Sequence, residues 1–192
     1  MPVKHVELLE SPGIVHDMPE QKLVESAFTS GQNVRFNQYG AETLPGDRSI
    51  FSAASITPLW VGAFPPITAP VWVYGDLTKM WAVESTTHTD LTRTTGGDYA
   101  GIASERWNSC VLAGFGFFNN TVDIPQSWDG FSTSNKLVNL ANWDTTRRCK
   151  SLRSFKNFLV ALNMTDSSVN RPYRVLWSSP AAPGALPPSW DS

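Results

Sequence analysis

The sequence predicts an all-β protein, built as an incomplete β-propeller-like array of hairpin blades behind an extended N-terminal arm. Two observations predict the β class. The chain spreads 14 Pro and 13 Gly over its 192 residues, and no window of twelve residues shows the sustained 3.6-residue apolar period of an amphipathic helix. A third observation, a weak internal repeat, predicts the array of blades.

The composition predicts an ordered chain with one sizeable core. Hydrophobic residues make up 41% of the chain and charged residues 17%, below the usual share of about 25%. The formal net charge of -2 gives no general attraction to nucleic acid or to an anionic membrane. Two cysteines, Cys110 and Cys149, are too few for a disulfide framework, so we expect free thiols. The longest apolar runs are far shorter than the roughly 20 residues that span a bilayer, so we expect no membrane insertion.

Residues 1–32 are expected to form an extended arm that packs against another part of the assembly. This stretch has scattered apolar positions and turn-forming sites at Ser11-Pro12-Gly13 and Ser30-Gly31. Leu23, Val24 and Phe28 allow one short helical turn. An ordinary N-terminal strand with a loose leader is an equally good interpretation. From Asn33 the alternation and turn signals become typical of strands, and residues 33–192 are predicted to form the blades.

The repeat consists of three hairpin-like segments that each end near a tryptophan. Trp81 and Trp128 are 47 residues apart, and Trp128 and Trp177 are 49 apart. A period of 40 to 50 residues with several strands per unit is typical of propeller blades. A β-sandwich with evenly spaced hairpins is the alternative. The paired apolar runs are Val71–Tyr74 with Lys79–Val83, Cys110–Gly114 with Phe115–Asn119, and Phe158–Leu162 with Tyr173–Trp177.

At this period the chain supplies about three to three and a half blades, fewer than the four to eight that typically close a propeller. We therefore expect either a fragment of a longer protein or a chain whose sheet is completed by partners. An open arc leaves strand edges and an apolar blade face uncovered, which favours association.

Two close pairs of histidine and carboxylate could in principle do acid–base chemistry. They are His16 with Asp17, and His88 with Asp90. The chain has no Gly-x-Ser-x-Gly nucleophile elbow. Both pairs are therefore interpreted as polar loop residues, and we expect no catalytic residue and no enzymatic activity.

Sequence motifs for metal binding or phosphate binding are also weak or absent in this chain. The chain has neither Cys-x-x-Cys nor His-x-x-x-His spacing, and its acidic residues are dispersed. Asp123, close to Asn119 and Asn120, suits a cation-binding loop but suits an ordinary Asx turn better. Gly114-Phe115-Gly116 is followed by further bulky residues and by no helix, so it is not expected to hold phosphate. We predict no metal and no cofactor.

One basic cluster is the candidate contact site for DNA or for a neighbouring subunit. Residues that alternate along a strand point to opposite faces, so these cations are not expected to form a single basic groove. One interpretation is contact with DNA phosphate or with an acidic subunit. The other, which we favour, is a solvated strand and loop that protects a sheet edge from aggregation. The cluster consists of Arg147, Arg148, Lys150, Arg153 and Lys156.

Short motifs over residues 6 to 191 occur in an order that resembles the N-terminal part of a virion structural protein of short-tailed bacteriophages, of the tail nozzle or hub type. No single motif is specific for this family, but their order over about 150 residues is specific for it. They are Asn33-Val34-Arg35-Phe36, Leu77-Thr78-Lys79, His88-Thr89-Asp90-Leu91-Thr92, Gly96-Gly97-Asp98-Tyr99, Trp107-Asn108, Asn119-Asn120, Pro125-Gln126-Ser127-Trp128, Phe155-Lys156-Asn157-Phe158-Leu159-Val160-Ala161-Leu162 and Trp177-Ser178-Ser179-Pro180-Ala181.

The resemblance implies a β-propeller-containing subunit, usually several hundred residues long, in a homohexamer ring below the portal and adaptor. Genomic DNA passes through such a ring, with non-specific contact in the channel, and the family has no catalytic residues. The expected function is structural: part of the DNA ejection conduit, in contact with the adaptor and other tail proteins. The expected location is the virion tail, after assembly in the host cytoplasm. This chain is shorter than that family's subunits.

Two other classes of function stay open. A carbohydrate-binding β module of a virion receptor-binding protein would stack exposed tryptophans on sugars. In a propeller, by contrast, Trp72, Trp128 and Trp177 are expected to be shielded in the blade cores. A hydrolase built on a propeller would need a cleft with converging carboxylates, and the sequence indicates none.

Overall fold

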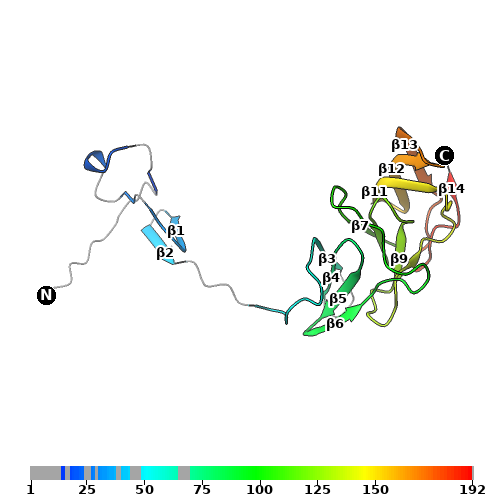
Figure 1. The fold of residues 1–192 in the computed structure, drawn as a ribbon, viewed down its shortest axis with the longest axis horizontal. Coiled ribbons are helices and arrows are strands. Elements are labelled where there is room, and N and C mark those ends of the chain that lie inside the picture. Colours follow the sequence, from blue (N-terminus) through cyan, green and yellow to red (C-terminus); the bar gives the residue numbers. More distant parts are fainter. Residues whose placement is uncertain are drawn as a thin grey trace. The chain divides into compact units, whose positions relative to one another are not determined.

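A computed structural model gives the fold of the chain, which divides into two compact units, residues 1–49 and 50–192 (Figure 1). The structure describes residues 14–15, 18–23, 27–28, 30–37, 40–43, 49–64 and 70–191. The boundary between the units follows Ser49, whereas the sequence interpretation separated residues 1–32 from 33–192. Each unit is described by itself below.

The first unit contains a single hairpin and one short helical turn in its described residues. Strands β1 (Val34–Asn37) and β2 (Gly40–Thr43) pair antiparallel. Arg35 and Glu42 lie directly opposite each other and form an exposed ion pair. The helical turn is a 3-10 turn, η1 (Glu20–Lys22), just before the residues for which the sequence allowed a turn. Ile14 and Phe28 form an isolated parallel bridge.

The second unit, as far as it is described, consists of three four-stranded antiparallel sheets, each made of four consecutive strands. The all-β class is confirmed. The first sheet contains β3 (Trp60–Phe64), β4 (Val71–Gly75), β5 (Met80–Glu84) and β6 (Thr87–Asp90). The second contains β7 (Asn108–Leu112), β8 (Phe115–Asn119), β9 (Gln126–Asp129) and β10 (Val138–Asn139). The third contains β11 (Arg147–Phe155), β12 (Phe158–Asp166), β13 (Val169–Ser178) and β14 (Trp190–Asp191).

Aromatic packing joins the first sheet to the second. The ring of Phe64 on β3 lies 5.0 Å from Phe118 on β8 and 5.8 Å from Trp128 on β9, measured between centroids. Trp60 meets Phe118 edge to face at 5.9 Å. A Cβ atom at Gly62 would come within 2.8 Å of two ring carbons of Trp60, so the packing requires glycine there. Phe64, Phe118 and Trp128 belong to one buried cluster with side chains from both sheets, and the partly buried Trp60 packs against it.

A second buried cluster joins the second sheet to the third. It contains Leu112 and Phe117 from the second sheet with Leu152, Leu159 and Leu176 from the third. Phe117 therefore points to the third sheet while its neighbour Phe118 points to the first. This alternation explains why β8 is apolar along most of its length: both of its faces are covered, which replaces the usual apolar–polar pattern of a half-exposed strand.

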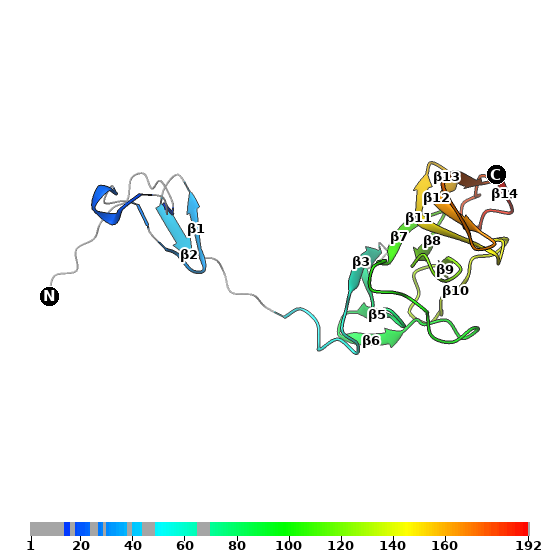
Figure 2. The same ribbon diagram turned by 45° about the horizontal axis from the view of Figure 1, so that its top comes forward.

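The first strands of the second and third sheets, β7 and β11, are bridged by asparagine side chains (Figure 2 shows the two strands side by side). The side-chain oxygen of Asn108 accepts from the Leu152 main-chain N–H at 3.0 Å, and its amide donates to the Lys150 carbonyl at 3.1 Å. From the adjacent strand β8, the Asn119 amide donates to the Cys149 carbonyl of β11 at 2.9 Å. These bonds satisfy edge groups of β11 that no neighbouring strand of its own sheet reaches.

Candidate functional site

Two outer faces, one on the first sheet and one on the third, are the candidate functional surfaces. The second sheet lies between the other two, so among the described residues of the second unit each outer sheet has one face that no other sheet covers. We call these the first outer face and the third outer face. Both carry apolar side chains, whereas an uncovered face of an antiparallel sheet is ordinarily polar.

Strand register defines the first outer face. Val71 and Val73 on β4 are buried toward the second sheet, so the alternate residues Trp72 and Tyr74 point outward. Trp72 is 38% exposed and Val61 on β3 is 59% exposed. The outward residues, in register across β3 to β6, are Val61, Ala63, Trp72, Tyr74, Trp81, Val83, His88 and Asp90.

A largely apolar cavity of about 310 Å³ hollows the first outer face. Residues 51–58 of the same chain form part of its wall together with the outward residues of the sheet. The ring of Phe51 lies 6.3 Å from that of Trp72, and the Ser55 main-chain N–H donates to the Tyr74 hydroxyl at 3.2 Å. The segment crosses the sheet but leaves Val61 and Trp72 exposed.

Two ring nitrogens of this face are buried and make no hydrogen bond with the described residues. They are Nε1 of Trp81 and Nε2 of His88. Nδ1 of His88 lies 2.7 Å from the Tyr74 hydroxyl, which already accepts from Ser55. The hydroxyl oxygen has a second lone pair, so the tautomer of the ring decides whether Tyr74 or Nδ1 is the donor in this contact. A buried polar nitrogen without a hydrogen-bond partner costs roughly 1–3 kcal/mol, so both nitrogens favour an additional polar partner at this face.

The third outer face carries protruding aromatic residues. Leu159, Ala161 and Leu176 are buried toward the second sheet, and the alternate residues point outward. Trp177 is 45% exposed and Tyr173 is 96% exposed. The larger exposed apolar residues of β11, β12 and β13 are Phe155, Leu162, Val169, Tyr173, Val175 and Trp177.

The basic cluster lies along β11 and the turn that follows it, and contacts within the chain occupy most of its donors. Arg147 is within 4 Å of Asp144 and Asp166, at 3.5 and 3.8 Å. Arg148 donates to the carbonyls of Val122, Thr145 and Arg147. Lys150 pairs with Glu105 at 2.9 Å, and Arg153 donates to Asn108 and to the Leu152 carbonyl. Lys156 lies over the Phe155 ring at 5.7 Å.

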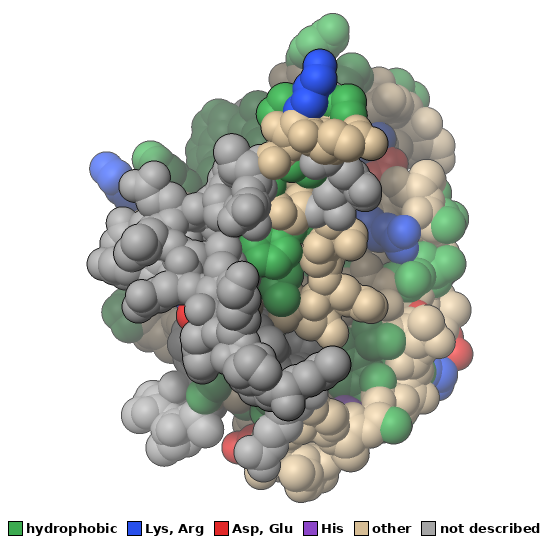
Figure 3. Space-filling view, turned by 90° about the vertical axis from the view of Figure 1, so that its left-hand side faces the viewer, with side chains coloured by type: hydrophobic (Ala, Val, Ile, Leu, Met, Phe, Trp, Pro, Cys, Tyr) green, Lys and Arg blue, Asp and Glu red, His purple; other side chains and the backbone are tan. Residues whose placement is uncertain are grey.

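These contacts favour a structural role for the cluster over a continuous basic groove. Figure 3 shows one face of the molecule, on which polar and apolar side chains separate the Lys and Arg side chains that can be seen. Lys150, Arg153 and Lys156 remain exposed. Contact of the cluster with DNA or with a subunit stays a prediction.

Asp123, the candidate cation ligand, is occupied by protein donors. Its carboxylate pairs with Arg93 at 2.8 Å and accepts from the Ala100 main-chain N–H and from the Asn120 amide, both at 2.8 Å. The Arg93 guanidinium also lies over the Tyr99 ring at 4.6 Å. The arrangement is a buried clasp between the β6–β7 connection and the β8–β9 loop. Among the described residues no group of three or more His, Cys, Asp or Glu side chains is placed to hold a metal ion.

Of the two histidine–carboxylate pairs, His88 with Asp90 lies within the described residues. His16 and Asp17 lie outside the described residues. His88 and Asp90 lie on the same face but have separate partners: His88 meets Tyr74, while Asp90 accepts from Thr92 at 2.7 Å and lies 3.8 Å from Lys136. Burial alone would raise the pKa of Asp90, but the Thr92 hydrogen bonds and the charges of Lys136 and Lys79 outweigh it, so the pKa lies below its usual value.

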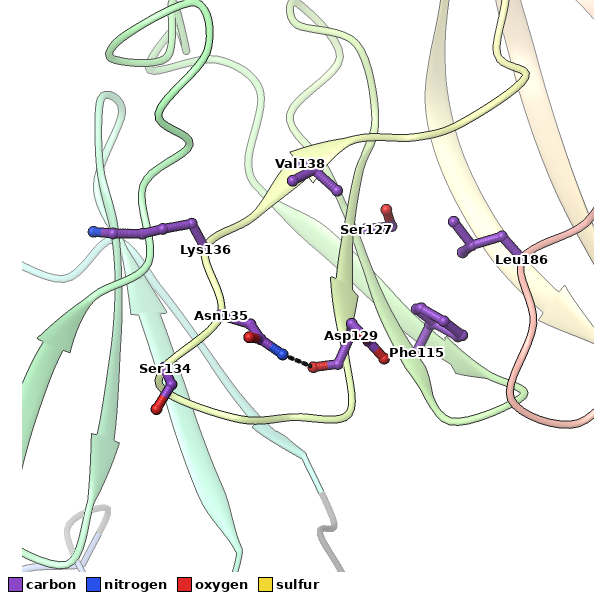
Figure 4. A pocket seen from close by; sticks show the side chains of 8 residues that line it. All are labelled: Phe115, Ser127, Asp129, Ser134, Asn135, Lys136, Val138 and Leu186. Atoms are coloured by element: carbon purple, nitrogen blue, oxygen red, sulfur yellow. Dashed lines mark hydrogen bonds between the residues drawn. The ribbon is translucent and has the colours of Figure 1, made fainter.

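The cavity drawn in Figure 4, of about 480 Å³, has a single carboxylate in its lining, that of Asp129. The Asn135 amide donates to the Asp129 main-chain carbonyl at 3.2 Å. Lys136 points away from the other lining residues, and its amine contacts Asp90. Among the described residues that line this cavity, Asp129 and Lys136 are the titratable ones, and Lys136 is directed to Asp90 instead of Asp129.

The two cysteines are free thiols. Cys149 is buried and Cys110 packs against the same cluster. Burial raises the pKa of each thiol to about 12, so both stay protonated at neutral pH and are poor nucleophiles.

The tryptophans that the sequence singled out differ in exposure. Trp128 is fully buried, and its indole N–H donates to the carbonyls of Ser132 and Asn135 at 3.0 and 3.1 Å. Trp72 and Trp177, which were expected to be shielded, are partly exposed on the first and third outer faces. That expectation fails for these two because each stands on a sheet face that no other sheet covers, and residues 51–58 cover the first of these faces only in part.

Comparison with protein-family models and with curated proteins found no match for this chain. Within the described residues no helix is long and apolar enough to cross a membrane.

Proposed function

We propose that this chain is a structural, non-enzymatic subunit of a short-tailed bacteriophage tail, of the nozzle or hub type that its sequence resembles. In this proposal it forms part of the DNA ejection conduit and contacts the adaptor and neighbouring tail proteins. The observation that carries the proposal is the stack of three sheets with two apolar outer faces. A chain of this kind reaches its lowest free energy only when other protein covers both faces.

The finer fold proposed is an incomplete β-propeller. Each sheet is a meander of four consecutive strands, the strand number of a propeller blade. The strands β7 and β11, which begin consecutive sheets, lie side by side, as first strands do around a propeller axis. The repeat tryptophans Trp81, Trp128 and Trp177 all lie on the third strand of their sheets. These three features support blades, and three blades are fewer than a closed ring needs.

The proposed role in a conduit requires a mechanically rigid subunit. The second sheet is buried on both faces, and the Asn108 bonds and the Arg93–Asp123 clasp connect elements that are distant in sequence. Buried, hydrogen-bonded contacts of this type resist sliding of one sheet past another. No step of this role requires a catalytic group.

The carbohydrate-binding alternative is favoured by one observation, the partial exposure of Trp72 and Trp177. Indole rings at such positions stack on sugar rings in lectin-like sites. Against it, the cavity beside Trp72 is lined mainly by apolar side chains, whereas a sugar site needs several polar partners.

The test is the content of purified phage particles encoded by a genome that contains this chain with a short C-terminal tag. Mass spectrometry should find the chain in the particles, and electron cryo-microscopy should place the tag on a ring in the tail below the portal and adaptor. Absence of the chain from particles that eject DNA normally would contradict the proposal. Binding of the purified chain to host surface glycans, abolished by Trp72→Ala or Trp177→Ala, would favour the alternative.

A further inference from the structure

We propose that residues 51–58 form a displaceable strap, which covers the centre of the first outer face in the free chain and leaves that face when the chain is assembled. The inference rests on the proposed function, because it names what shields this face before other tail protein covers it. The strap belongs to the second unit of the same chain. Four of its residues line the cavity on that face: Phe51, Ser52, Ala54 and Pro58.

The strap accounts for an uneven pattern of burial on the first outer face. Tyr74 on β4 lies opposite Val61 on β3, and both point outward. Val83 on β5 lies opposite Trp72 and also points outward. Tyr74 and Val83 are nevertheless only 4% and 3% exposed, whereas Val61 is 59% exposed. Among the described residues no other sheet reaches this face, and the strap lines the same cavity as Tyr74 and Val83, so the strap supplies their cover.

The strap is attached by contacts that each involve a side chain, and not by strand pairing. Residues 51–58 are all described, and they belong to no strand or helix. The contacts with the sheet include a ring contact of 6.3 Å between centroids and two hydrogen bonds of 3.2 Å each. They join Phe51 to Trp72, the Ser55 main-chain N–H to the Tyr74 hydroxyl, and the Ser52 hydroxyl to the Thr86 carbonyl. A segment without ladder hydrogen bonds opens at a lower free energy than the strands beneath it.

The strap also packs loosely on the sheet. Phe51 and Ile56 are partly buried, and the remaining residues of the strap are exposed. These remaining residues are Ala, Ser, Thr and Pro, so they bury little apolar surface. Strap and sheet together line a cavity of about 310 Å³, whereas well-packed protein interiors leave few voids larger than a water molecule. A layer that stays in place permanently would be expected to fill such a space.

Removal of the strap would turn the first outer face into one continuous apolar surface. Tyr74 and Val83 would then join Val61 and Trp72, their neighbours across β3, β4 and β5. An uncovered apolar patch of this kind drives association with other protein. While the strap is closed, it keeps the two central side chains from water, so the free chain exposes less apolar surface than the assembled subunit presents.

The first test measures hydroxyl-radical oxidation of Tyr74 in the purified full chain, with fully buried Trp128 as the reference. Phe51→Ala removes the ring of the strap, so Tyr74 should be oxidised at least about threefold faster while Trp128 stays protected. The matched control is Ile50→Ala, a neighbouring apolar residue that is 79% exposed, and it should leave the rate unchanged. Circular dichroism and thermal melting of each variant establish that it folds. An unchanged rate in Phe51→Ala would overturn the strap as the cover of Tyr74.

The second test needs no variant. Urea is raised in steps through the unfolding transition of the unmodified chain, and the oxidation of Tyr74 and Trp128 is followed at each step. Tyr74 should become oxidisable at lower urea than Trp128, because the strap opens while the sheets are still folded. A common midpoint for the two residues would show that the strap opens only when the sheets unfold, and would overturn its displacement.

The third test applies the same footprinting to assembled tails. The Phe51 ring should be oxidised at least about twofold faster than in the free chain, whereas Tyr74 should stay protected by the protein that covers the face. Free-chain rates for both residues would mean that the strap stays closed, and fast oxidation of both would mean that nothing covers the face. Either result would overturn displacement on assembly. Absence of the chain from tail particles would count against the proposed function, while the two tests on the purified chain judge the strap itself.

Discussion

The side-chain oxygen of Asn108 on β7 accepts a hydrogen bond from the main-chain N–H of Leu152 on β11 at 3.0 Å. The Asn108 amide donates to the carbonyl of Lys150, so one side chain satisfies a donor and an acceptor at the edge of the third sheet. Two sheets that share no strand ladder are thus joined by a side chain that acts in place of a neighbouring strand.

Asn108→Ala should therefore lower the free energy of unfolding by about 1–3 kcal/mol, because it leaves the main-chain groups of Leu152 and Lys150 without their partner. Equilibrium urea unfolding measures the change. The control is Asn170→Ala, an exposed position on β13 for which a loss below about 0.5 kcal/mol is expected. Equal losses in the two variants would contradict the bridging role of Asn108.

The Arg93–Asp123 pair should be the costliest ion pair of the described residues to break. Both side chains are about one-tenth exposed, at 10% and 11%. Asp123→Ala leaves a buried guanidinium without its carboxylate, and we expect a loss of about 3–5 kcal/mol in the free energy of unfolding. Asp98→Ala, which removes the exposed pair with Lys79, should cost at most about 1 kcal/mol. Similar losses in the two variants would show that burial of the clasp contributes little.

The β12–β13 turn should be improved by residues that tolerate left-handed backbone. Ser167 and Ser168 have φ values of 47° and 69° between the paired residues Asp166 and Val169. A two-residue turn of this type strongly favours Asn-Gly. Ser167→Asn with Ser168→Gly should raise the free energy of unfolding by about 1 kcal/mol, measured by thermal and urea unfolding. Ser134→Gly, at a position whose own φ is not positive, should not stabilise the chain. A destabilised Asn-Gly variant would contradict the turn geometry.

Stability should fall at alkaline pH because of the buried thiols. Burial raises the pKa of Cys110 and Cys149 to about 12, above the value of about 9 for an exposed thiol. A thiol whose pKa is higher in the folded than in the unfolded protein stabilises the fold fully below its pKa in the unfolded protein. This stabilisation is lost as the pH rises toward the pKa in the folded protein. The free energy of unfolding should therefore decline between about pH 9 and pH 12, by up to about 1.4 kcal/mol per pH unit for each thiol.

The measurement for the thiols is the slope of urea stability against pH, compared with the slope for the double variant Cys110→Ala/Cys149→Ala. The double variant should be less stable at pH 7 because of the cavity, but its slope above pH 9 should be shallower. An unchanged slope would assign the alkaline loss to other groups, such as Tyr99, whose pKa burial also raises.

The β class was predictable because strands leave a local signal: Pro and Gly punctuation and apolar runs that match β4, β5, β8, β12 and β13. The tryptophan repeat found structurally equivalent strands, since Trp81, Trp128 and Trp177 each lie on a third strand. It did not predict which way each indole points, because the side is set by strand register: Trp128 faces the neighbouring sheet, whereas Trp177 faces outward.

Contacts between distant segments were beyond sequence reasoning. Asp123 is in an Asx-rich loop, but its ion-pair partner Arg93 is thirty positions earlier and is brought to it only by packing of the first sheet on the second. Lys150 likewise meets Glu105 across 45 positions. Composition shows that such charges exist but not which of them neutralise one another. The outer faces were expected in general terms, as an uncovered flank, but their residues required the strand register.

The most direct test of the account is hydroxyl-radical footprinting of the indoles in assembled tails, read by mass spectrometry, with fully buried Trp128 as the internal reference. If further protein covers both outer faces, Trp72 and Trp177 should be oxidised as slowly as Trp128. Oxidation of Trp72 and Trp177 at the rate expected for partly exposed indoles, with Trp128 protected, would contradict the claim that these faces are assembly surfaces.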